Sequence, residues 1–233
     1  MIYYQFLKYK IKFYKKLKKD LKNFNEPYWW THAKPNLIDD LEWELTADVV
    51  IVGAGYTGLS AALTLLKSGL KVIIIDSEIP GYGASSRNGG ITSGKIKPSI
   101  KELISKFGLE LAKKMIEEGE TARQDLYDFI RKEKIDCDLK INGMFIGALS
   151  KKSHENQKKD DDFNSEYLGI ENRIVEKKDV PKFIGSKKYV GGIFDKKIGS
   201  IHPAKLVISM TKMVRKSGGY IFNKTTFKNC EKK

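Results

Sequence analysis

Residues 48–76 read DVVIVGAGYTGLSAALTLLKSGLKVIIID, and this stretch decides the fold. An apolar run leads into a glycine-rich turn (53–58), and a helical segment follows as far as residue 68. A second apolar run (72–75) then ends on Asp76. Strand, glycine turn, helix, strand and acid, in that order, form the dinucleotide-binding fingerprint in the context that it requires. The stretch therefore predicts a βαβ unit within a parallel sheet.

Each glycine of the turn has a separate predicted task. Gly53 allows a tight turn, Gly55 leaves room for a pyrophosphate to approach the backbone, and Gly58 lets helix and strand pack closely. The N–H groups at the start of the helix offer the positive end of the helix dipole to phosphates. Asp76 stands where a carboxylate accepts hydrogen bonds from a ribose diol. The predicted cofactor-binding residues of this unit are Gly53, Ala54, Gly55, Tyr56, Thr57, Gly58, Asp76 and Ser77. A structural βαβ turn without a ligand is the alternative.

A loop rich in small residues follows, GYGASSRNGG at positions 81–90. Such loops often carry function, and the small side chains indicate a close approach to a ligand. Arg87 is placed to neutralise a pyrophosphate, and a surface ion pair is its alternative role. The predicted cofactor-binding residues of this loop are Gly83, Ala84, Ser85, Arg87, Asn88, Gly89 and Gly90.

The composition and the residue spacing argue against several classes of function. The chain has 233 residues, a formal net charge of +14 and a pI of about 9.5, with lysine supplying most of the positive charge. Since arginine dominates specific base and phosphate recognition, we do not expect specific nucleic-acid binding. No cysteine or histidine stands at a metal-ligand spacing, so no metal site is predicted. Two distant cysteines fit a cytoplasmic setting, and no apolar run is long enough to span a membrane.

Residues 1–25 differ from the rest of the chain. Lysines alternate there with apolar residues that recur every three or four positions, which is the pattern of a basic amphipathic helix. One interpretation is a helix on an anionic membrane surface, which would make the protein peripheral to the inner face of the membrane. The other is an extension whose apolar stripe packs on the body of the protein.

The remaining segments are predicted from periodicity and turn signals. Residues 26–47 form an irregular lead-in with Trp29 and Trp30, which cover apolar surface or, in the less favoured interpretation, face a substrate. Residues 101–134 form helices interrupted at Gly108. Asn142-Gly143 predicts a β-hairpin between its flanking apolar runs. His202-Pro203 opens a further helix, and a strand follows it.

The stretch VVIVGAGYTGLSAALTLLKSG followed by GYGASSRNGG resembles the FAD-dependent oxidoreductases of the D-amino-acid-oxidase-like superfamily, nearest the gamma-glutamylputrescine oxidoreductase type. The lead-in YWW and the segment GSIHP before a helix are similar too. The resemblance runs from about residue 27 to about residue 228. It implies an α/β fold in which a Rossmann-like FAD-binding domain is interleaved with a partial mixed-sheet substrate domain. The implied division is a basic extension, the first part of the FAD-binding domain, a partial substrate domain and a return segment of the FAD-binding domain (1–25, 26–136, 137–200 and 201–233).

The resemblance also implies a cofactor and a reaction. The implied cofactor is FAD, with the loop 81–90 running past its phosphates and its flavin ring. The implied reaction is the oxidation of a C–N bond in a small-molecule amine or amino acid. No catalytic residue is predicted. Members of the family are roughly twice as long, so the resemblance implies an N-terminal portion, which is a fragment, a truncated gene product or one piece of a split protein. In the last case a complementing C-terminal chain is an expected partner. Two alternatives stay open: an NAD-linked dehydrogenase, and a non-catalytic or split-subunit FAD-binding fragment.

Overall fold

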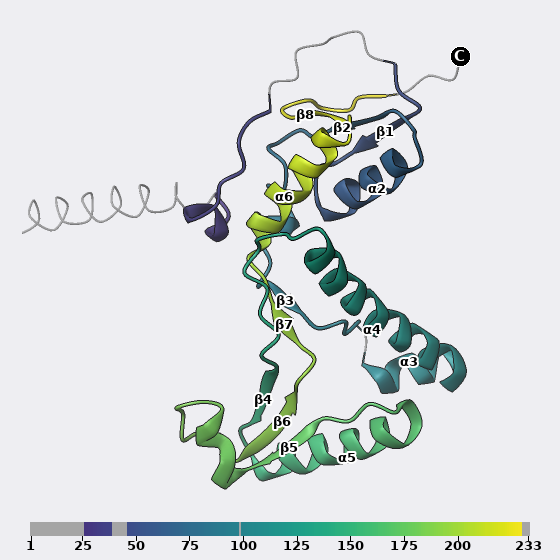
Figure 1. Cartoon of the computed structure of the whole chain (residues 1–233). Coiled ribbons are helices and arrows are strands. Elements are labelled where there is room, and N and C mark those ends of the chain that lie inside the picture. The colour runs from purple at the N-terminus through teal and green to yellow at the C-terminus, as the bar shows by residue number, and fades with distance from the viewer. Residues whose placement is uncertain (1–25, 39–45, 98, 230–233) are drawn as a thin grey trace, which may run out of the picture. The chain divides into compact units, whose positions relative to one another are not determined.

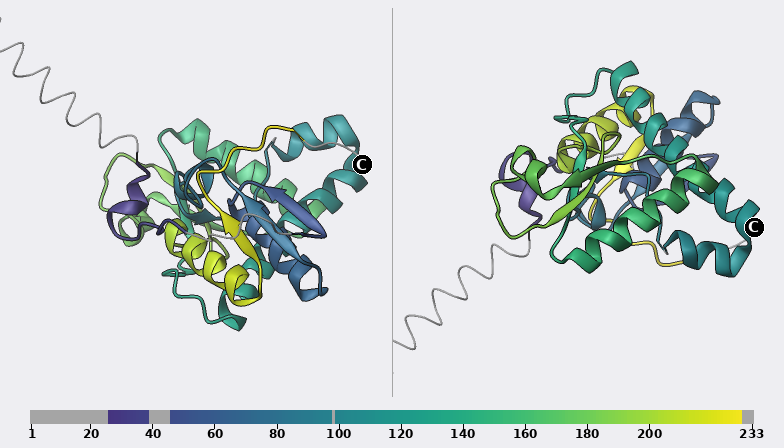
Figure 2. Two further views of the ribbon diagram at one scale, coloured as in Figure 1. Left: turned by 90° about the horizontal axis from the view of Figure 1, so that it is seen from above. Right: turned by 90° about the horizontal axis from the view of Figure 1, so that it is seen from below.

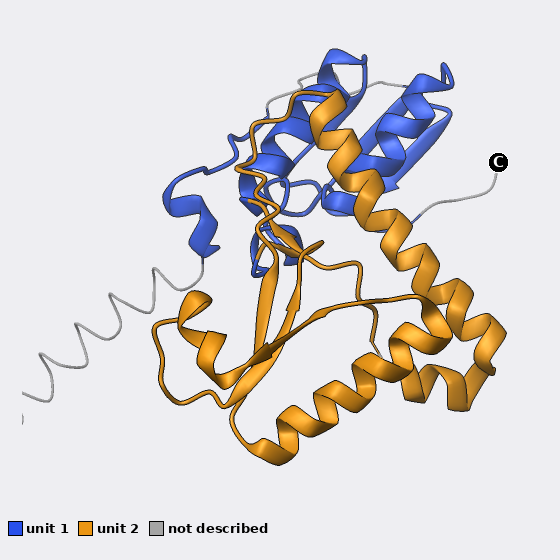
Figure 3. Ribbon diagram, turned by 60° about the horizontal axis from the view of Figure 1, so that its bottom comes forward, with its two compact units in different colours: residues 1–89, 202–233 blue, residues 90–201 orange. Residues whose placement is uncertain are grey.

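The computed structural model describes residues 26–38, 46–97 and 99–229. The chain divides into two compact units, coloured separately in Figure 3. The first unit contains residues 1–89 and 202–233, and the second contains residues 90–201. The predicted division into a FAD-binding domain (26–136 and 201–233) and a partial substrate domain (137–200) stays a prediction.

The first unit is built on the predicted parallel sheet. Its strands β1 (Val49–Val52), β2 (Val72–Ile75) and β8 (Tyr220–Phe222) lie in the order β1-β2-β8 (Figure 1). Ile51, Ile74 and Ile221 are aligned across the three strands. Aligned residues share a face, and the fully buried Ile74 and Ile221 place the core of the unit on that face.

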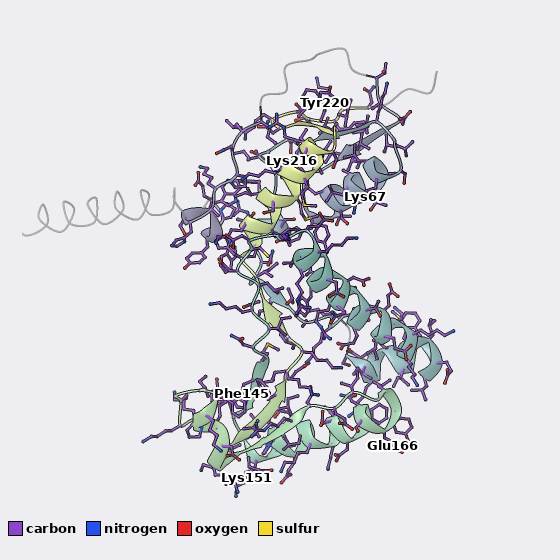
Figure 4. All side chains as sticks on the ribbon, in the orientation of Figure 1. Lys67, Phe145, Lys151, Glu166, Lys216 and Tyr220 are labelled. Carbon is purple, nitrogen blue, oxygen red and sulfur yellow. The ribbon has the colours of Figure 1, made fainter. Side chains whose placement is uncertain are left out.

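Helices α2 (Tyr56–Lys67) and α6 (Pro203–Lys216) pack beside each other on one side of this sheet (Figures 1 and 2). Pro203 occupies the first turn of α6, where its missing N–H costs nothing, and the Nδ1 of His202 accepts a hydrogen bond from the N–H of Lys205. Lys67 and Lys216 stand at the C-terminal ends of the two helices (Figure 4), where a positive charge complements the helix dipole. The predicted helix after His202-Pro203 is confirmed.

The other side of the same sheet is exposed on its two edge strands, while Ile73 of the central strand β2 is 9% exposed and therefore buried. Val50 and Val52 on β1 are 55% and 61% exposed, and Tyr220 on β8, labelled in Figure 4, is 37% exposed. Val50 is aligned with Ile73, which is in turn aligned with Tyr220, so these side chains share a face. Parallel sheets are normally covered on both faces. We call Val50, Val52 and Tyr220 the open face of the first unit.

The second unit contains two small antiparallel sheets. Strands β4 (Met144–Ala148), β6 (Gly191–Asp195) and β5 (Arg173–Glu176) lie in the order β4-β6-β5, and β3 (Ile91–Thr92) pairs with β7 (Gly199–Ser200). Its helices are α3 (Ile100–Phe107), α4 (Leu109–Lys132) and α5 (Lys151–Leu168), with short 3-10 turns η1 (Tyr28–Thr31) and η2 (Ala84–Ser86) in the first unit and η3 (Lys177–Lys182) in the second. The predicted break at Gly108 is confirmed, since this glycine has φ +76° between α3 and α4.

The predicted hairpin at Asn142-Gly143 is wrong. Lys140 forms an isolated bridge with Ser200, and β4 pairs with β6, so both flanking runs pair with the segment 191–200 rather than with each other. A two-residue type I′ turn needs a positive φ at both central residues. Gly143 has φ +76° but Asn142 does not have a positive φ, and the N–H of Gly143 donates to the carbonyl of Ile198.

Rings cover the glycines of the β4-β6-β5 sheet. A Cβ at Gly147 would lie 2.4 Å from the ring of Tyr189, and a Cβ at Gly192 would lie 2.5 Å from the ring of Phe145. Phe145 is labelled in Figure 4. On the opposite face, His154 of α5 covers Gly191 in the same way, at 2.2 Å. The strand glycines therefore make room for rings on both faces of the sheet.

A second close contact explains a glycine in the middle of α4. A Cβ at Gly119 would lie 2.3 Å from the carbonyl oxygen of Gly94, and a Cβ at Gly94 would lie 2.6 Å from the carbonyl oxygen of Gly119. Glycine inside a helix costs about 1 kcal/mol relative to alanine. Here it allows the loop backbone after β3 to lie directly on the helix.

The described helices do not include one with the length and hydropathy that crossing a bilayer requires. The predicted basic amphipathic helix (1–25) lies outside the described residues, so both interpretations of that segment stay predictions.

We expect Gly119→Ala to lower the stability of the protein although alanine is the better helix former. The added methyl group must displace the Gly94 carbonyl, which costs about 1–3 kcal/mol and outweighs the gain of about 1 kcal/mol in helix propensity. Thermal unfolding measures the effect. Thr121→Ala, on an exposed position of the same helix, is the control and leaves the midpoint unchanged or slightly raised. A higher midpoint for Gly119→Ala would contradict the packing argument.

Candidate cofactor site

The glycine-rich turn joins β1 to α2 through backbone contacts. Gly53 has φ +105°, and its N–H donates to the carbonyl of Ile75 at 2.8 Å. A Cβ at Gly58 would lie 1.9 Å from the carbonyl oxygen of Gly53 and 3.2 Å from Cγ2 of Ile51. The predicted conformational tasks of Gly53 and Gly58 are thus confirmed, and their contact with a cofactor stays a prediction.

Gly55 makes room for a side chain of the following loop. A Cβ there would lie 2.9 Å from Oγ of Ser85, and the same Oγ accepts a hydrogen bond of 3.0 Å from the N–H of Tyr56. Tyr56 begins α2, whose first N–H groups have no acceptor within the helix. Ser85 therefore satisfies one of these donors and fixes the loop to the turn.

The carboxylate of Asp76 is turned toward the backbone of the turn. Its Oδ2 accepts from the N–H of Ala54 at 2.7 Å, and its Oδ1 accepts from the N–H of Glu78 at 2.8 Å. An ionised carboxylate offers about four acceptor positions, so these two bonds leave capacity for hydroxyl donors. The predicted contact with a ribose diol is compatible with this arrangement and stays a prediction.

The loop of small residues is fastened at its start. The N–H of Gly81, which has φ +77°, donates to the carbonyl of Ala54 at 3.0 Å, and a Cβ at Gly81 would lie 2.7 Å from Val207 of α6. The guanidinium of Arg87 lies 4.5 Å from the ring centre of Tyr82, and its Nε donates to the Tyr82 carbonyl at 2.8 Å. A cation–π contact and a hydrogen bond thus orient Arg87 at the surface.

The lead-in segment packs against the same loop. The Nε1–H of Trp29 donates to the carbonyl of Asn88 at 2.8 Å, while Trp30 is 6% exposed and its ring centre lies 5.8 Å from that of Tyr82. The described residues 26–31 and 86–89 together line a cavity of about 840 Å³. The prediction that these tryptophans cover apolar surface is confirmed for Trp30, whereas Trp29 is half-buried beside the cavity.

Two helix N-termini meet at this end of the first unit. The hydroxyl of Tyr56, at the start of α2, donates to the carbonyl of Pro203, at the start of α6, at 3.0 Å. Both helices therefore direct the positive ends of their dipoles to the same region, which favours an anion there.

The carboxyl groups with a clearly lowered pKa lie elsewhere, in the second unit. Hydrogen bonds from Ser99, Lys158 and Lys182 lower the pKa of Glu102, Glu176 and Asp179, respectively. Within the described part of the chain, no three His, Cys, Asp or Glu residues are grouped so that they could hold a metal ion.

The structure gathers most of the predicted residues around the turn. Among the predicted cofactor-binding residues, those exposed to solvent are Thr57, Ser77, Gly83, Ala84, Arg87, Asn88 and Gly89. Gly90 belongs to the second unit, where its carbonyl accepts from the N–H of Ile201 at 2.8 Å. The sequence did not predict the hydrogen bond from Gly81 to Ala54 or the one from the Trp29 indole to Asn88. Both join segments that are distant in sequence, 59 residues apart for Trp29 and Asn88, and no local pattern indicates such a contact.

One protein family matches most of the chain. The model described as DAO, FAD dependent oxidoreductase, matches residues 48–233. The gamma-glutamylputrescine oxidoreductase of Escherichia coli (strain K12) is 32% identical over 191 residues, which are 79% of this chain and 43% of that protein. The probable oxidoreductase OrdL of Haemophilus influenzae is 32% identical over 180 residues, 77% of this chain and 42% of that protein. The chain thus spans less than half the length of these curated relatives.

Solved structures share the fold. An L-amino acid deaminase from Proteus vulgaris has a TM-score of 0.62 at 23% identity, covering 81% of this chain and 48% of that one. A glycine oxidase from Geobacillus kaustophilus has a TM-score of 0.62 at 19% identity, covering 76% and 46%. At these identities the likeness shows the α/β fold alone. The resemblance seen in the sequence is confirmed by the match over residues 48–233: the chain belongs to the DAO family of FAD-dependent oxidoreductases.

Proposed function

We propose that this chain supplies the dinucleotide-binding part of an enzyme that uses FAD to oxidise a C–N bond of a small amine or amino acid. The observation that carries the proposal is the arrangement of turn, acid and loop around the start of α2, in a chain of the DAO family. Relatives named for gamma-glutamylputrescine, glycine and L-amino acids support the substrate class. One fold neighbour with FAD bound is named for L-alpha-glycerophosphate, so the fold alone does not select a C–N bond.

The residues of the site fit a dinucleotide. A Cβ added at Gly53, Gly83 or Gly89 would meet nothing within 4 Å, so the backbone beside these glycines is open to a ligand. The N-termini of α2 and α6 supply positive potential to the same region. Asp76 retains acceptor capacity at the edge of the turn.

The chain's own residues bind and orient in this proposal. Bound FAD supplies the acceptor for a hydride equivalent. The first N–H groups of α2 and the guanidinium of Arg87 offset the charge of a pyrophosphate, and Asp76 accepts hydrogen bonds from a ribose. Ser85 and Gly81 hold the loop against the turn, which fixes Arg87 relative to α2.

We expect the purified chain to bind FAD more tightly than NAD, because the loop of small residues after Asp76 suits the longer flavin nucleotide. Flavin fluorescence anisotropy and competition with NAD measure both affinities. Tighter binding of NAD would favour the dehydrogenase alternative, and binding of neither nucleotide would contradict the proposal for the chain alone.

Arg87→Ala should weaken FAD binding by about 10- to 150-fold, since a charge-assisted hydrogen bond contributes roughly 1.5–3 kcal/mol. Riboflavin binding should not change, because riboflavin carries no pyrophosphate. The matched control is Arg131→Ala, which removes an exposed arginine paired with Asp128 in the second unit. Equal losses for FAD and riboflavin would show that Arg87 shapes the loop rather than neutralising a pyrophosphate.

A complementing polypeptide is a second element of the proposal, favoured by the open face. Val50 and Val52 present apolar surface on a parallel strand, and the matched relatives are more than twice as long as the aligned region. We infer that this face accepts a covering layer, which the polypeptide corresponding to the remainder of the relatives would supply.

Val52→Lys should therefore reduce the binding of an apolar dye, anilinonaphthalene sulfonate, and reduce self-association in sedimentation velocity, without lowering the unfolding midpoint. The reason is that a side chain 61% exposed adds little to the core but much to the apolar surface. Leu149→Lys, at a position that is 68% exposed in the second unit and outside the open face, is the control and should change neither measurement. Unchanged dye binding in Val52→Lys would contradict the role of the open face.

A further inference from the structure

The lead-in segment before β1 makes a specific contact with the predicted cofactor loop. The indole N–H of Trp29 donates to the backbone carbonyl of Asn88 at 2.8 Å, across 59 residues of sequence. The ring of Trp29 also lies against that of His202, with 4.9 Å between ring centres and 59° between planes. Trp29 therefore holds two other segments of the first unit at once.

Hydrogen bonds continue from Asn88 to the start of α2. The side-chain Nδ2 of Asn88 donates to the carbonyls of Ala84 and Ser85, at 3.0 and 3.1 Å, which closes the short turn η2. The Oγ of Ser85 then accepts from the N–H of Tyr56 at 3.0 Å. Trp29, Asn88, Ser85 and Tyr56 thus form a continuous series of hydrogen-bonded residues, which we call the indole relay.

The other contact of Trp29 reaches the second helix of the site. His202 is the N-cap of α6, and its Nδ1 accepts from the N–H of Lys205. Because the hydroxyl of Tyr56 bonds to the carbonyl of Pro203, the relay and the ring contact end at the same pair of helix N-termini. A single side chain of the lead-in is thereby connected to both groups of N–H donors that face the predicted phosphates.

The neighbouring tryptophan provides a contrast. Trp30 is 6% exposed and packs on Tyr82, yet its Nε1 is buried without an acceptor among the described residues. Its contribution is therefore apolar packing, whereas Trp29 is half-buried and contributes a directed hydrogen bond. Of these two adjacent tryptophans, Trp30 therefore contributes packing and Trp29 contributes the hydrogen bond that positions the loop.

From this geometry we propose that Trp29 is a positioning residue for the cofactor: through the indole relay it sets the conformation of the loop 84–88 and its attachment to the first turn of α2, beside which the FAD phosphates bind. The proposal rests on the proposed function for the identity of the ligand. It goes beyond it by assigning a role in cofactor affinity to a residue outside the dinucleotide fingerprint.

Trp29→Phe in the full chain is the test, because phenylalanine keeps an aromatic ring on His202 and removes the N–H donor. We expect the Kd for FAD to rise about three- to tenfold, the range expected for the loss of one hydrogen bond. The unfolding midpoint of the cofactor-free chain should change little. Trp30→Phe is the matched control: it trims a buried ring, so the midpoint should fall while the Kd for FAD stays within about twofold.

Ser85→Ala tests whether the residues act as one unit. If they do, adding Trp29→Phe to Ser85→Ala weakens FAD binding by less than the product of the two single effects. Multiplicative effects would show that Trp29 and Ser85 act separately, which would overturn the relay.

A measurement without FAD separates this proposal from the proposed function. Hydrogen–deuterium exchange of the cofactor-free chain should show faster exchange at the N–H of Tyr56 and across residues 84–88 in Trp29→Phe, and no change there in Trp30→Phe. Unchanged exchange, or an equal Kd for wild type and Trp29→Phe, would overturn the positioning role while leaving FAD binding intact. If the wild type binds no FAD but the exchange difference is present, the proposed function fails and the relay stands as a structural feature.

Discussion

Gly58 of α2 and the carbonyl oxygen of Gly53 meet with no room for a side chain between them. A Cβ at position 58 would lie 1.9 Å from that oxygen. This contact sets how closely the helix approaches the strand, and so where the first N–H groups of α2 stand relative to Asp76 and Ser85. The position of the loop follows from this approach, because Ser85 and Gly81 fasten the loop to the turn that the approach shapes.

The parts of the fold that follow from short-range pattern were predictable. The βαβ unit, the helices on either side of Gly108 and the helix after His202-Pro203 rest on apolar periodicity and on glycine or proline at their ends. Buried on both faces, β2 reads as a continuous apolar run of the kind expected within a parallel sheet. In each case the deciding interactions lie within a few residues of the signal.

The features that could not be predicted depend on partners distant in sequence. Asn142-Gly143 has the composition of a hairpin turn, but the strand 191–195 offers β4 a longer ladder than the preceding run does. Gly119 looks unfavourable within a helix until Gly94 is seen against it. The Trp29 indole is likewise uninformative in the sequence, since its acceptor is a backbone carbonyl, which every residue carries. Of the candidate site, the residue types were therefore predictable and the hydrogen bonds that join them were not.

The placement of β8 has a consequence for how the chain matures on the ribosome. The first unit is discontinuous: β2 ends at Ile75, but its neighbour β8 begins only at Tyr220, after the whole contiguous second unit has been synthesised. At about 5–20 residues per second, the first two strands of the parallel sheet wait roughly 7–30 s for the third. The second unit can therefore complete its fold before the first unit does, although synthesis of the first unit begins earlier. This order of folding follows from the topology of the chain.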